Sequence, residues 1–134
     1  MERNKSNKAI ISLGSNIEPE RNICNAKNLL RLKYKILSES TFIKTKPIGS
    51  DNQNDFLNGS VYIETSQNLK QLKTSLKNLE RVMGRVEKTH KFAARIIDLD
   101  IIVWNSKIID KDFYHRDYLK KTVYELIPHL KISS

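Results

Sequence analysis

Two aspartates separated by a single residue lie in the most apolar stretch of the sequence. They are Asp98 and Asp100, and every other residue from 96 to 104 is apolar. Because side chains alternate along a strand, we expect both carboxylates on one face, with Cα atoms about 7 Å apart. Two adjacent negative charges are costly unless cations neutralise them, and Mg²⁺ ions that also bind phosphate oxygens would do so. The pair therefore predicts a metal–triphosphate site.

The residues around the pair help to decide between a metal site and an ordinary solvent-exposed strand. Alternating acids and aliphatic residues are also common on the solvent-facing side of a sheet, which is the alternative interpretation. The stretch is too apolar for a solvated edge strand, and Arg95 precedes it, placed to meet a metal-bound anion. Arg85 and Arg95 flank a basic segment that we expect to fold over a triphosphate, although Arg85 alone fits a surface arginine equally well. Glycine-rich phosphate loops are absent from the sequence, so metal and side chains must hold the phosphates.

A second group of residues is suited to a flat heterocycle. The segment TKPIG at residues 45–49 forms a turn after one expected strand, and Phe56 and Asn58 lie near the start of the next. Asn58 offers an amide and Phe56 a ring for stacking. Taken singly, Phe56 is more often a core residue and Asn58 more often a turn residue. Only together do these positions predict a binding pocket.

The apolar pattern predicts the elements that must position these residues. It indicates a strand at residues 9–13, a helix from residue 20, strands at 36–45 and 56–65, a helix at 69–82 and a strand at 96–104. The order βαββαβ is typical of an α+β ferredoxin-like fold, an antiparallel sheet with helices on one face. Residues 105–134 are expected to be a short C-terminal appendage, with a helix or turn near residues 124–130.

Length and charge limit the function further. With 134 residues, the chain is expected to form a single domain spanning residues 1–134. No apolar run is long enough to span a membrane and no secretory signal is recognisable, so a cytoplasmic monomer without a membrane partner is expected. A net charge of +9 suits an anionic partner. Nucleic acid is not the expected one, because the aromatic pattern of an RNA-binding sheet is missing.

Five segments together resemble the family of 6-hydroxymethyl-7,8-dihydropterin pyrophosphokinases, which transfer pyrophosphate from ATP to a pterin alcohol in folate biosynthesis. They are ISLGSN at residues 11–16, TKPIG at 45–49, DFLNGSV at 55–61, LERVMGR at 79–85 and RIIDLDI at 95–101. The resemblance covers residues 9 to about 104, and the last segment is the most specific.

The resemblance implies a role for each matching residue. Asp98 and Asp100 would hold two Mg²⁺ ions that bridge the ATP phosphates, and Arg85 and Arg95 would be the arginines of a catalytic loop. The pterin hydroxymethyl oxygen would attack the β-phosphorus in line, and AMP would leave. The implied nucleotide contacts are Glu80, Ile101, His115 and Arg116. The implied pterin contacts are Thr45, Pro47, Ile48, Phe56, Asn58 and Tyr118.

Some positions depart from the pattern of that family. Residues 92–95 read Phe-Ala-Ala-Arg where the family usually has Trp-Gly-Pro-Arg, and Glu87 places a negative charge on the expected loop. The part after residue 104 is shortened, and a surface histidine is the alternative interpretation of His115. Three hypotheses therefore stay open: an active pyrophosphokinase, a family-derived pterin- and nucleotide-binding protein with weak or no catalytic activity, and, ranked last, a nucleic-acid-binding ferredoxin-like module.

Overall fold

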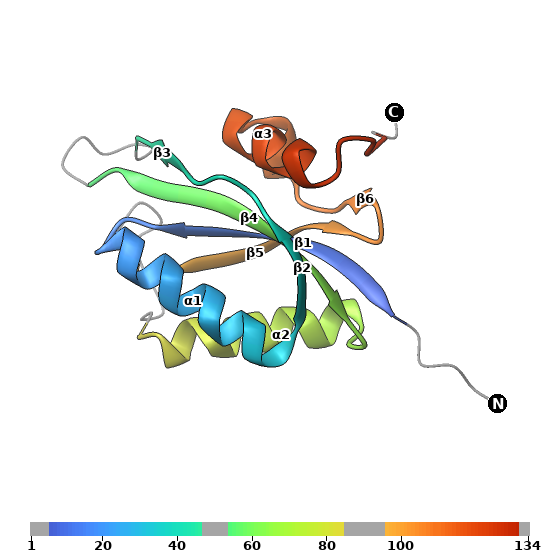
Figure 1. The fold of residues 1–134 in the computed structure, drawn as a ribbon, viewed down its shortest axis with the longest axis horizontal. Coiled ribbons are helices and arrows are strands. Elements are labelled where there is room, and N and C mark those ends of the chain that lie inside the picture. The colour runs from blue at the N-terminus through green and yellow to red at the C-terminus, as the bar shows by residue number, and fades with distance from the viewer. Residues whose placement is uncertain (1–5, 47–53, 85–95, 132–134) are drawn as a thin grey trace.

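The computed structural model describes residues 6–46, 54–84 and 96–131, and in these ranges the chain forms a mixed α and β structure (Figure 1). The strands are β1 (Asn7–Ser15), β2 (Lys35–Glu39), β3 (Ile43–Thr45), β4 (Phe56–Thr65), β5 (Asp98–Trp104) and β6 (Lys107–Ile108). The helices are α1 (Pro19–Lys33), α2 (Leu69–Val82), the short 3₁₀ helix η1 (Lys111–Tyr114) and α3 (Asp117–Leu126).

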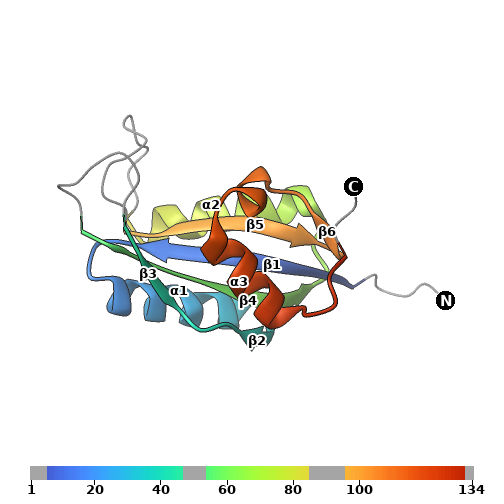
Figure 2. The same ribbon diagram turned by 90° about the horizontal axis from the view of Figure 1, so that it is seen from above.

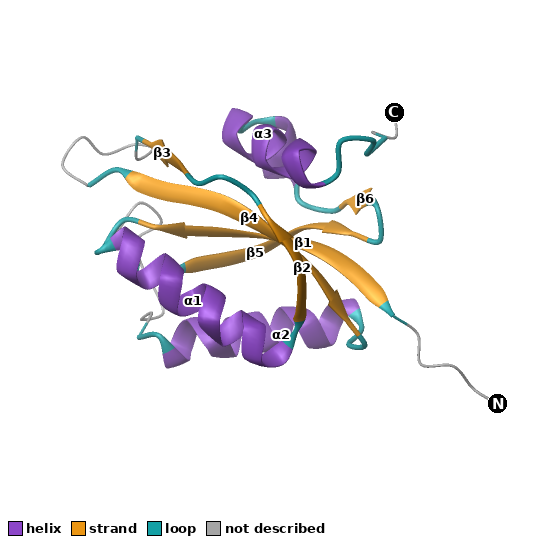
Figure 3. Ribbon diagram, in the orientation of Figure 1, coloured by secondary structure: helices purple, strands orange, loops and turns teal. Residues whose placement is uncertain are grey.

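The strands form one antiparallel sheet in the order β2-β4-β1-β5-β6, and β3 also pairs with β4. With α1 and α2 connecting its strands, this is the predicted ferredoxin-like α+β class, which is confirmed. Helices α1 and α2 cover one face of the sheet, and α3 lies on the other (Figure 3). Within the described ranges, no helix has the length and apolar character needed to cross a membrane.

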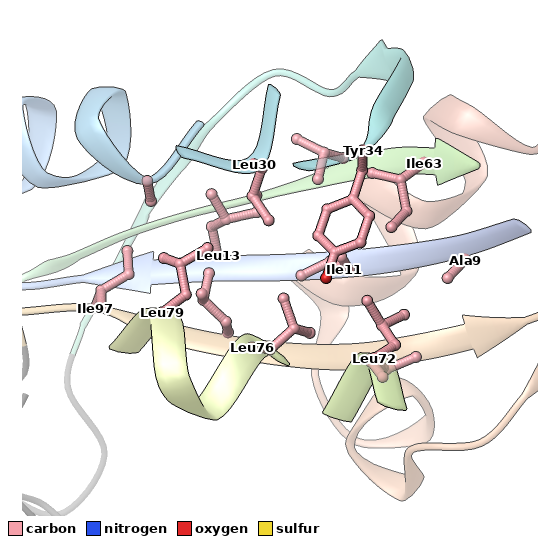
Figure 4. Close-up of a cluster of buried hydrophobic side chains, with 14 of the residues drawn as sticks. Ala9, Ile11, Leu13, Leu30, Tyr34, Ile63, Leu72, Leu76, Leu79 and Ile97 are labelled. Atoms are coloured by element: carbon pink, nitrogen blue, oxygen red, sulfur yellow. The ribbon is translucent and has the colours of Figure 1, made fainter. Parts of the chain in front are cut away.

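The face under α1 and α2 carries the larger core. Leu72, Leu76 and Leu79 recur at helical spacing on α2 and are buried against Ile11 and Leu13 of β1 (Figure 4). Helix α2 begins at an Asn68 capping box that satisfies its first backbone N–H groups. Each fully buried leucine contributes about 1.5–3 kcal/mol, so this face supplies much of the stability.

The face under α3 carries a second, smaller core at one end of the sheet. It comprises Ile10, Ile102, Val103, Phe113, Leu119, Val123 and Leu130. A β-bulge in β5 makes it possible, because Ile11 pairs with Ile101 while Ile10 pairs with Val103. The extra residue, Ile102, thus lies on the same face as Val103. The bulge separates the apolar end of β5 from the end that carries the two aspartates.

The expected single strand at residues 36–45 is wrong, because it is interrupted between β2 and β3. The hydroxyl of Ser40 accepts the backbone N–H of Ser60, and the backbone N–H of Thr41 donates to Glu125 of α3. Regular pairing is only partly kept here, since the backbone N–H of Ser40 still donates to the carbonyl of Ser60 while that of Thr41 turns to α3. The apolar pattern could not show this break, since it depends on a helix residue 84 positions later in the chain.

The C-terminal region also differs from expectation. Its helix is Asp117–Leu126, not residues 124–130, and it covers the second face of the sheet. Strand β6 was not predicted. It follows a two-residue turn in which Asn105 and Ser106 both have positive φ, 47° and 68°, as a tight hairpin requires. Asn-Ser lacks the glycine that usually marks such a turn.

The surroundings of β5 also differ from expectation. The strand was expected to be too apolar for an edge, yet β6 pairs with it only through Val103 and Trp104. At Asp98 and Asp100 the described partner of β5 is β1 alone, so the two acids lie at an edge of the sheet. An edge strand presents backbone N–H and C=O groups outward, which makes this a suitable place for a ligand.

Candidate active site

The two aspartates lie on the α3 face of β5. Leu99 between them is 4% exposed and packs in the core on the other face, whereas Asp98 is half-buried and Asp100 exposed. In the sheet, Asp98 is opposite Gly14 and Asp100 opposite Ser12 of β1. The alternation expected from the sequence is therefore present, and both carboxylates lie above small residues of the neighbouring strand.

Glu80 of α2 fixes the backbone between the two acids. Its side chain is 3% exposed, and its Oε2 accepts a hydrogen bond from the backbone N–H of Leu99 at 2.7 Å. Charge-assisted bonds of this kind are short and directional. Glu80 thus lies beneath the strand, where it holds Asp98 and Asp100 in place.

The environment of Asp100 favours binding of a cation. Loss of water around its carboxylate, followed by the charges of Asp98, Glu80 and Asp110, raises its pKa to about 7, and Lys77 opposes this shift. The side chain is exposed because it lines an open pocket, but the pocket walls still displace water from the carboxylate. A divalent cation would relieve the repulsion among these acids. The donor set therefore fits Mg²⁺.

The protein alone does not complete a metal site in the described part of the chain. No group of three or more His, Cys, Asp or Glu side chains is arranged there to hold a metal ion. Mg²⁺ typically takes one or two carboxylates and completes its octahedron with water and substrate phosphates. The geometry therefore suits a metal that arrives with a nucleotide.

A pocket of about 230 Å³ opens beside Asp100, between α2 and the edge of β5. Its walls are Lys73, Leu76, Lys77, Leu99, Asp100, Ile101, Ile109 and Asp110. The mixture of aliphatic side chains, two lysines and a strand edge suits a flat polar ring with an anionic tail. Of the predicted nucleotide contacts, Ile101 lies in this wall.

A second polar group continues across the sheet from Asp98. Asn58 of β4 is opposite Gly14, which is itself opposite Asp98, so the three share one row. Asn58 is 8% exposed, and its Nδ2 donates to Thr45 Oγ1 at 2.6 Å. A Cβ on Gly14 would lie 2.7 Å from Asn58 Oδ1 and 3.8 Å from Phe56 Cδ1. Because Gly14 has no side chain, Asn58 and Phe56 have room to lie beside its backbone.

Helix α3 brings further predicted residues to the same face. Tyr118 is half-buried; burial raises its pKa, Arg116 lowers it, and the charges of Asp112 and Asp100 raise it further. Tyr118 thus lies close enough to Asp100 to be affected by its charge. Arg116 precedes α3 and pairs with Asp112 at 3.5 Å, and the adjacent His115 is exposed.

Other predicted residues are not placed. Pro47, Ile48, Arg85 and Arg95 lie outside the described residues, so the catalytic loop stays a prediction. In the other direction, sequence reasoning missed Lys73 and Lys77 in the pocket wall. Each directly follows a buried leucine of α2, so each lies at the border of the buried side of the helix. This spacing could have indicated that they lie beside β5. Ile109 and Asp110 carried no such signal, because they follow the unexpected hairpin.

These features define a class of protein: a ferredoxin-like sheet with paired carboxylates beside a pocket that can take a nucleotide base. Comparison with known proteins is more specific. Residues 10–132 match the family model of 7,8-dihydro-6-hydroxymethylpterin-pyrophosphokinase. The match covers most of the chain, and the chain belongs to this family.

Individual relatives agree with this assignment. The chain is 29% identical over 133 residues to the 2-amino-4-hydroxy-6-hydroxymethyldihydropteridine pyrophosphokinase of Haemophilus influenzae, covering 91% of this chain and 82% of that protein. Proteins of the same name from Campylobacter jejuni and Bacillus subtilis are 34% and 33% identical, over 75% and 80% of this chain and 65% of each relative. The predicted family, and with it the transferase class of folate biosynthesis, is thereby confirmed.

Proposed function

We propose that Asp98 and Asp100 carry the reaction of this family in the present chain, the transfer of pyrophosphate from ATP to 6-hydroxymethyl-7,8-dihydropterin. The pterin hydroxymethyl oxygen forms a bond to the β-phosphorus, the bond from that phosphorus to the oxygen of the α-phosphate breaks, and AMP leaves while the hydroxyl proton is released. The observation that carries the proposal is the group of mutually repelling acids around Asp100, beside a pocket at the edge of β5.

On the nucleotide side, the pocket at the β5 edge takes the adenine, and the triphosphate extends over the two aspartates. Ile101 contributes to the wall for the base. The charge of Lys77 lowers the pKa of Asp100, so the two side chains lie close together. Bound Mg²⁺ would supply neutralisation of the phosphate charge during transfer, and two ions are proposed. Arg116, directly before α3, is the proposed side-chain contact to the phosphates from that helix.

On the pterin side, Asn58 and Thr45 supply polar groups for the edge of the ring. Phe56 supplies one aromatic face, and Tyr118 of α3 the other. The row from Asp98 through Gly14 to Asn58 supports a pterin pocket next to the proposed metal site. A pterin held there would direct its hydroxymethyl group toward the phosphates, and such positioning is a large part of phosphoryl-transfer catalysis. Pro47, Ile48, Arg85 and Arg95 complete the proposal as predictions.

Release of AMP from Mg²⁺-ATP and the pterin alcohol tests the proposal. We expect Asp98→Ala to lower turnover by about 10³-fold or more, because the phosphate charge is then no longer neutralised. Glu20→Ala, an exposed acid of α1 on the opposite face, is the matched control and should keep wild-type turnover. Undiminished AMP release by Asp98→Ala would reject the assignment of the metal site.

A second candidate function remains open because of the sequence of the expected catalytic loop. Phe-Ala-Ala-Arg at residues 92–95 and Glu87 depart from the family pattern. A wild-type protein that binds the pterin and ATP in equilibrium dialysis without releasing AMP would be a family-derived binding protein. The single domain over residues 1–134, the monomeric state and the cytoplasmic location stay predictions from the sequence.

A further inference from the structure

Helix α3 crosses the sheet on the face opposite α1 and α2 (Figure 2). The spacing of three of its residues places their side chains along one side of the helix. Tyr118, Thr122 and Glu125 are spaced by four and three residues, which places them on one side of a helix over about 10 Å. Thr122 contacts Ser60 of β4, and Glu125 contacts Thr41 between β2 and β3. Tyr118 packs against the second core. We call these residues the α3 stripe.

The middle of the α3 stripe is a buried hydrogen bond. Thr122 and Ser60 of β4 are both fully buried, and their hydroxyl oxygens are 2.8 Å apart. The backbone N–H of Ser60 donates to Ser40 Oγ at 2.8 Å, and its carbonyl accepts the N–H of Ser40 at 2.9 Å. Thr122 is therefore connected through Ser60 to the segment between β2 and β3.

The C-terminal end of the stripe contacts that same segment directly. The backbone N–H of Thr41 donates to both carboxylate oxygens of Glu125, at 3.2 and 3.0 Å, and the hydroxyl of Thr41 donates to Oε1 at 2.8 Å. One carboxylate thus accepts two donors of one residue. Hydrogen bonds to a charged acceptor are strong and fix the orientation of both partners.

Three residues separate Thr41 from Thr45 of the proposed pterin pocket, and this short segment is tightly constrained. A Cβ on Gly59 would lie 2.5 Å from ring carbons of Phe42, so this ring packs directly on the backbone of β4. At the end of the segment, Thr45 accepts the hydrogen bond from Asn58. A shift at Thr41 would therefore reach Thr45 and Asn58.

We propose that Glu125 and Thr122 are positioning residues that set the separation between Tyr118 on α3 and the Thr45–Asn58 wall on the sheet. The inference rests on the proposed function, in which the pterin lies between these two walls. One end of the α3 stripe is near Asp100 and the other holds the segment that leads into Thr45. Helix α3 thus fixes the distance between the two walls of the proposed pterin pocket.

The apolar contacts of α3 cannot supply this alignment by themselves. Leu119 and Val123 are buried against the second core, which holds the helix on the sheet. Apolar packing is non-directional, so by itself it does not fix how α3 is aligned with residues 40 and 41. The hydrogen bonds of Thr122 and Glu125 are directional and select one position. Loss of Glu125 should therefore affect alignment more than stability.

The first part of the test uses the free protein and does not depend on the pterin. Hydrogen exchange is measured in Glu125→Ala, in Glu125→Gln, and in Lys121→Ala, an exposed residue of the same helix. We expect exchange at residues 41–45 to become about tenfold faster in Glu125→Ala. Glu125→Gln, which keeps an acceptor, should restore most of the protection, and Lys121→Ala should match the wild type.

The second part compares two affinities by calorimetry. In Glu125→Ala, the Kd for the pterin should rise about five- to twentyfold, while the Kd for a Mg²⁺-bound, non-hydrolysable ATP analogue changes less than twofold. Equal weakening of both ligands, or unchanged exchange at residues 41–45, would overturn the proposal. Should Glu125→Ala fail to fold, Thr122→Val tests the same separation of affinities. If the wild type binds no pterin, the proposed function fails, and the exchange result still decides whether Glu125 holds the segment.

Discussion

One face of the sheet carries the larger core and the other carries the candidate site, and strand β5 contributes to both. Toward α1 and α2 it presents Leu99 and Ile101, which are buried in the larger core together with Ile97 just before the strand. Toward α3 it presents Asp98 and Asp100. Because strand side chains alternate, the same backbone is anchored by the apolar set and presents the acids at a fixed spacing. The site is rigid because its other face is well packed.

Strand β1 shows the same division with different residue types. Its helix-side residues Ala9, Ile11 and Leu13 are buried in the larger core, while Ser12 and Gly14 lie on the opposite face. Small side chains on the second face leave room above the sheet, next to the two aspartates. Large apolar side chains cover one face of β1, and only small residues lie on the other face at the site. Substitutions on opposite faces should therefore affect different properties.

The largest effect on stability is expected on the helix face. Leu72→Ala removes a fully buried side chain of α2 and should lower the free energy of unfolding by about 2–5 kcal/mol. Leu32→Ala, at an 83% exposed position of α1, should change it by less than about 0.5 kcal/mol. Denaturant unfolding measures both. Turnover per folded molecule should stay unchanged in each, and a selective loss of turnover in Leu72→Ala would contradict the division of faces.

On the other face, Phe56→Ala should weaken pterin binding by about 1–3 kcal/mol through lost stacking and burial. Phe56→Tyr keeps the ring face and should bind the pterin nearly as well as the wild type. Calorimetric titration with the pterin alcohol measures both variants. An unchanged affinity in Phe56→Ala would show that the ring is a packing residue only.

Most of the fold could be predicted because it depends on local patterns. The spacing of Leu72, Leu76 and Leu79 predicted α2 closely, and the strand predicted at residues 96–104 begins two residues later in the structure, at Asp98. Two features escaped prediction because their causes are distant in sequence. The break after β2 depends on contacts of Thr41 with Glu125. The position of α3 depends on the second core, whose residues come from several separate segments.

The candidate site was predicted unevenly for a related reason. Asp98 and Asp100 could be found because their spacing along one strand has a direct geometric meaning. The pocket wall from Ile109 and Asp110 could not, because it is placed by the hairpin at Asn105. Sequence patterns predict what one element does; they do not predict which residues a tight turn brings beside it.

Two glycines on opposite faces provide a closer comparison. In Gly59→Ala the new methyl group would meet the ring of Phe42, and overpacking should lower stability by about 1–3 kcal/mol. In Gly14→Ala it would meet the end of the Asn58 side chain, which can rotate away. That variant should lose about 1 kcal/mol of pterin affinity with a smaller change in stability. Equal unfolding midpoints for the two variants would contradict the assignment of faces.

The smallest effect concerns the charge of Asp100 in the protein without ligands. Its pKa of about 7 in the folded state lies above the ordinary value of 3.8, so between about pH 4 and 7 the folded state binds more protons than the unfolded state. Stability must then fall as pH rises through this window, and the loss is complete above it. Asp100→Asn removes the loss and should stabilise the protein by about 1 kcal/mol at pH 8, allowing for screening by solvent at this exposed position, and by almost nothing at pH 4. Denaturant midpoints at the two pH values measure this, and an equal difference at both would show that repulsion among the acids is not its source.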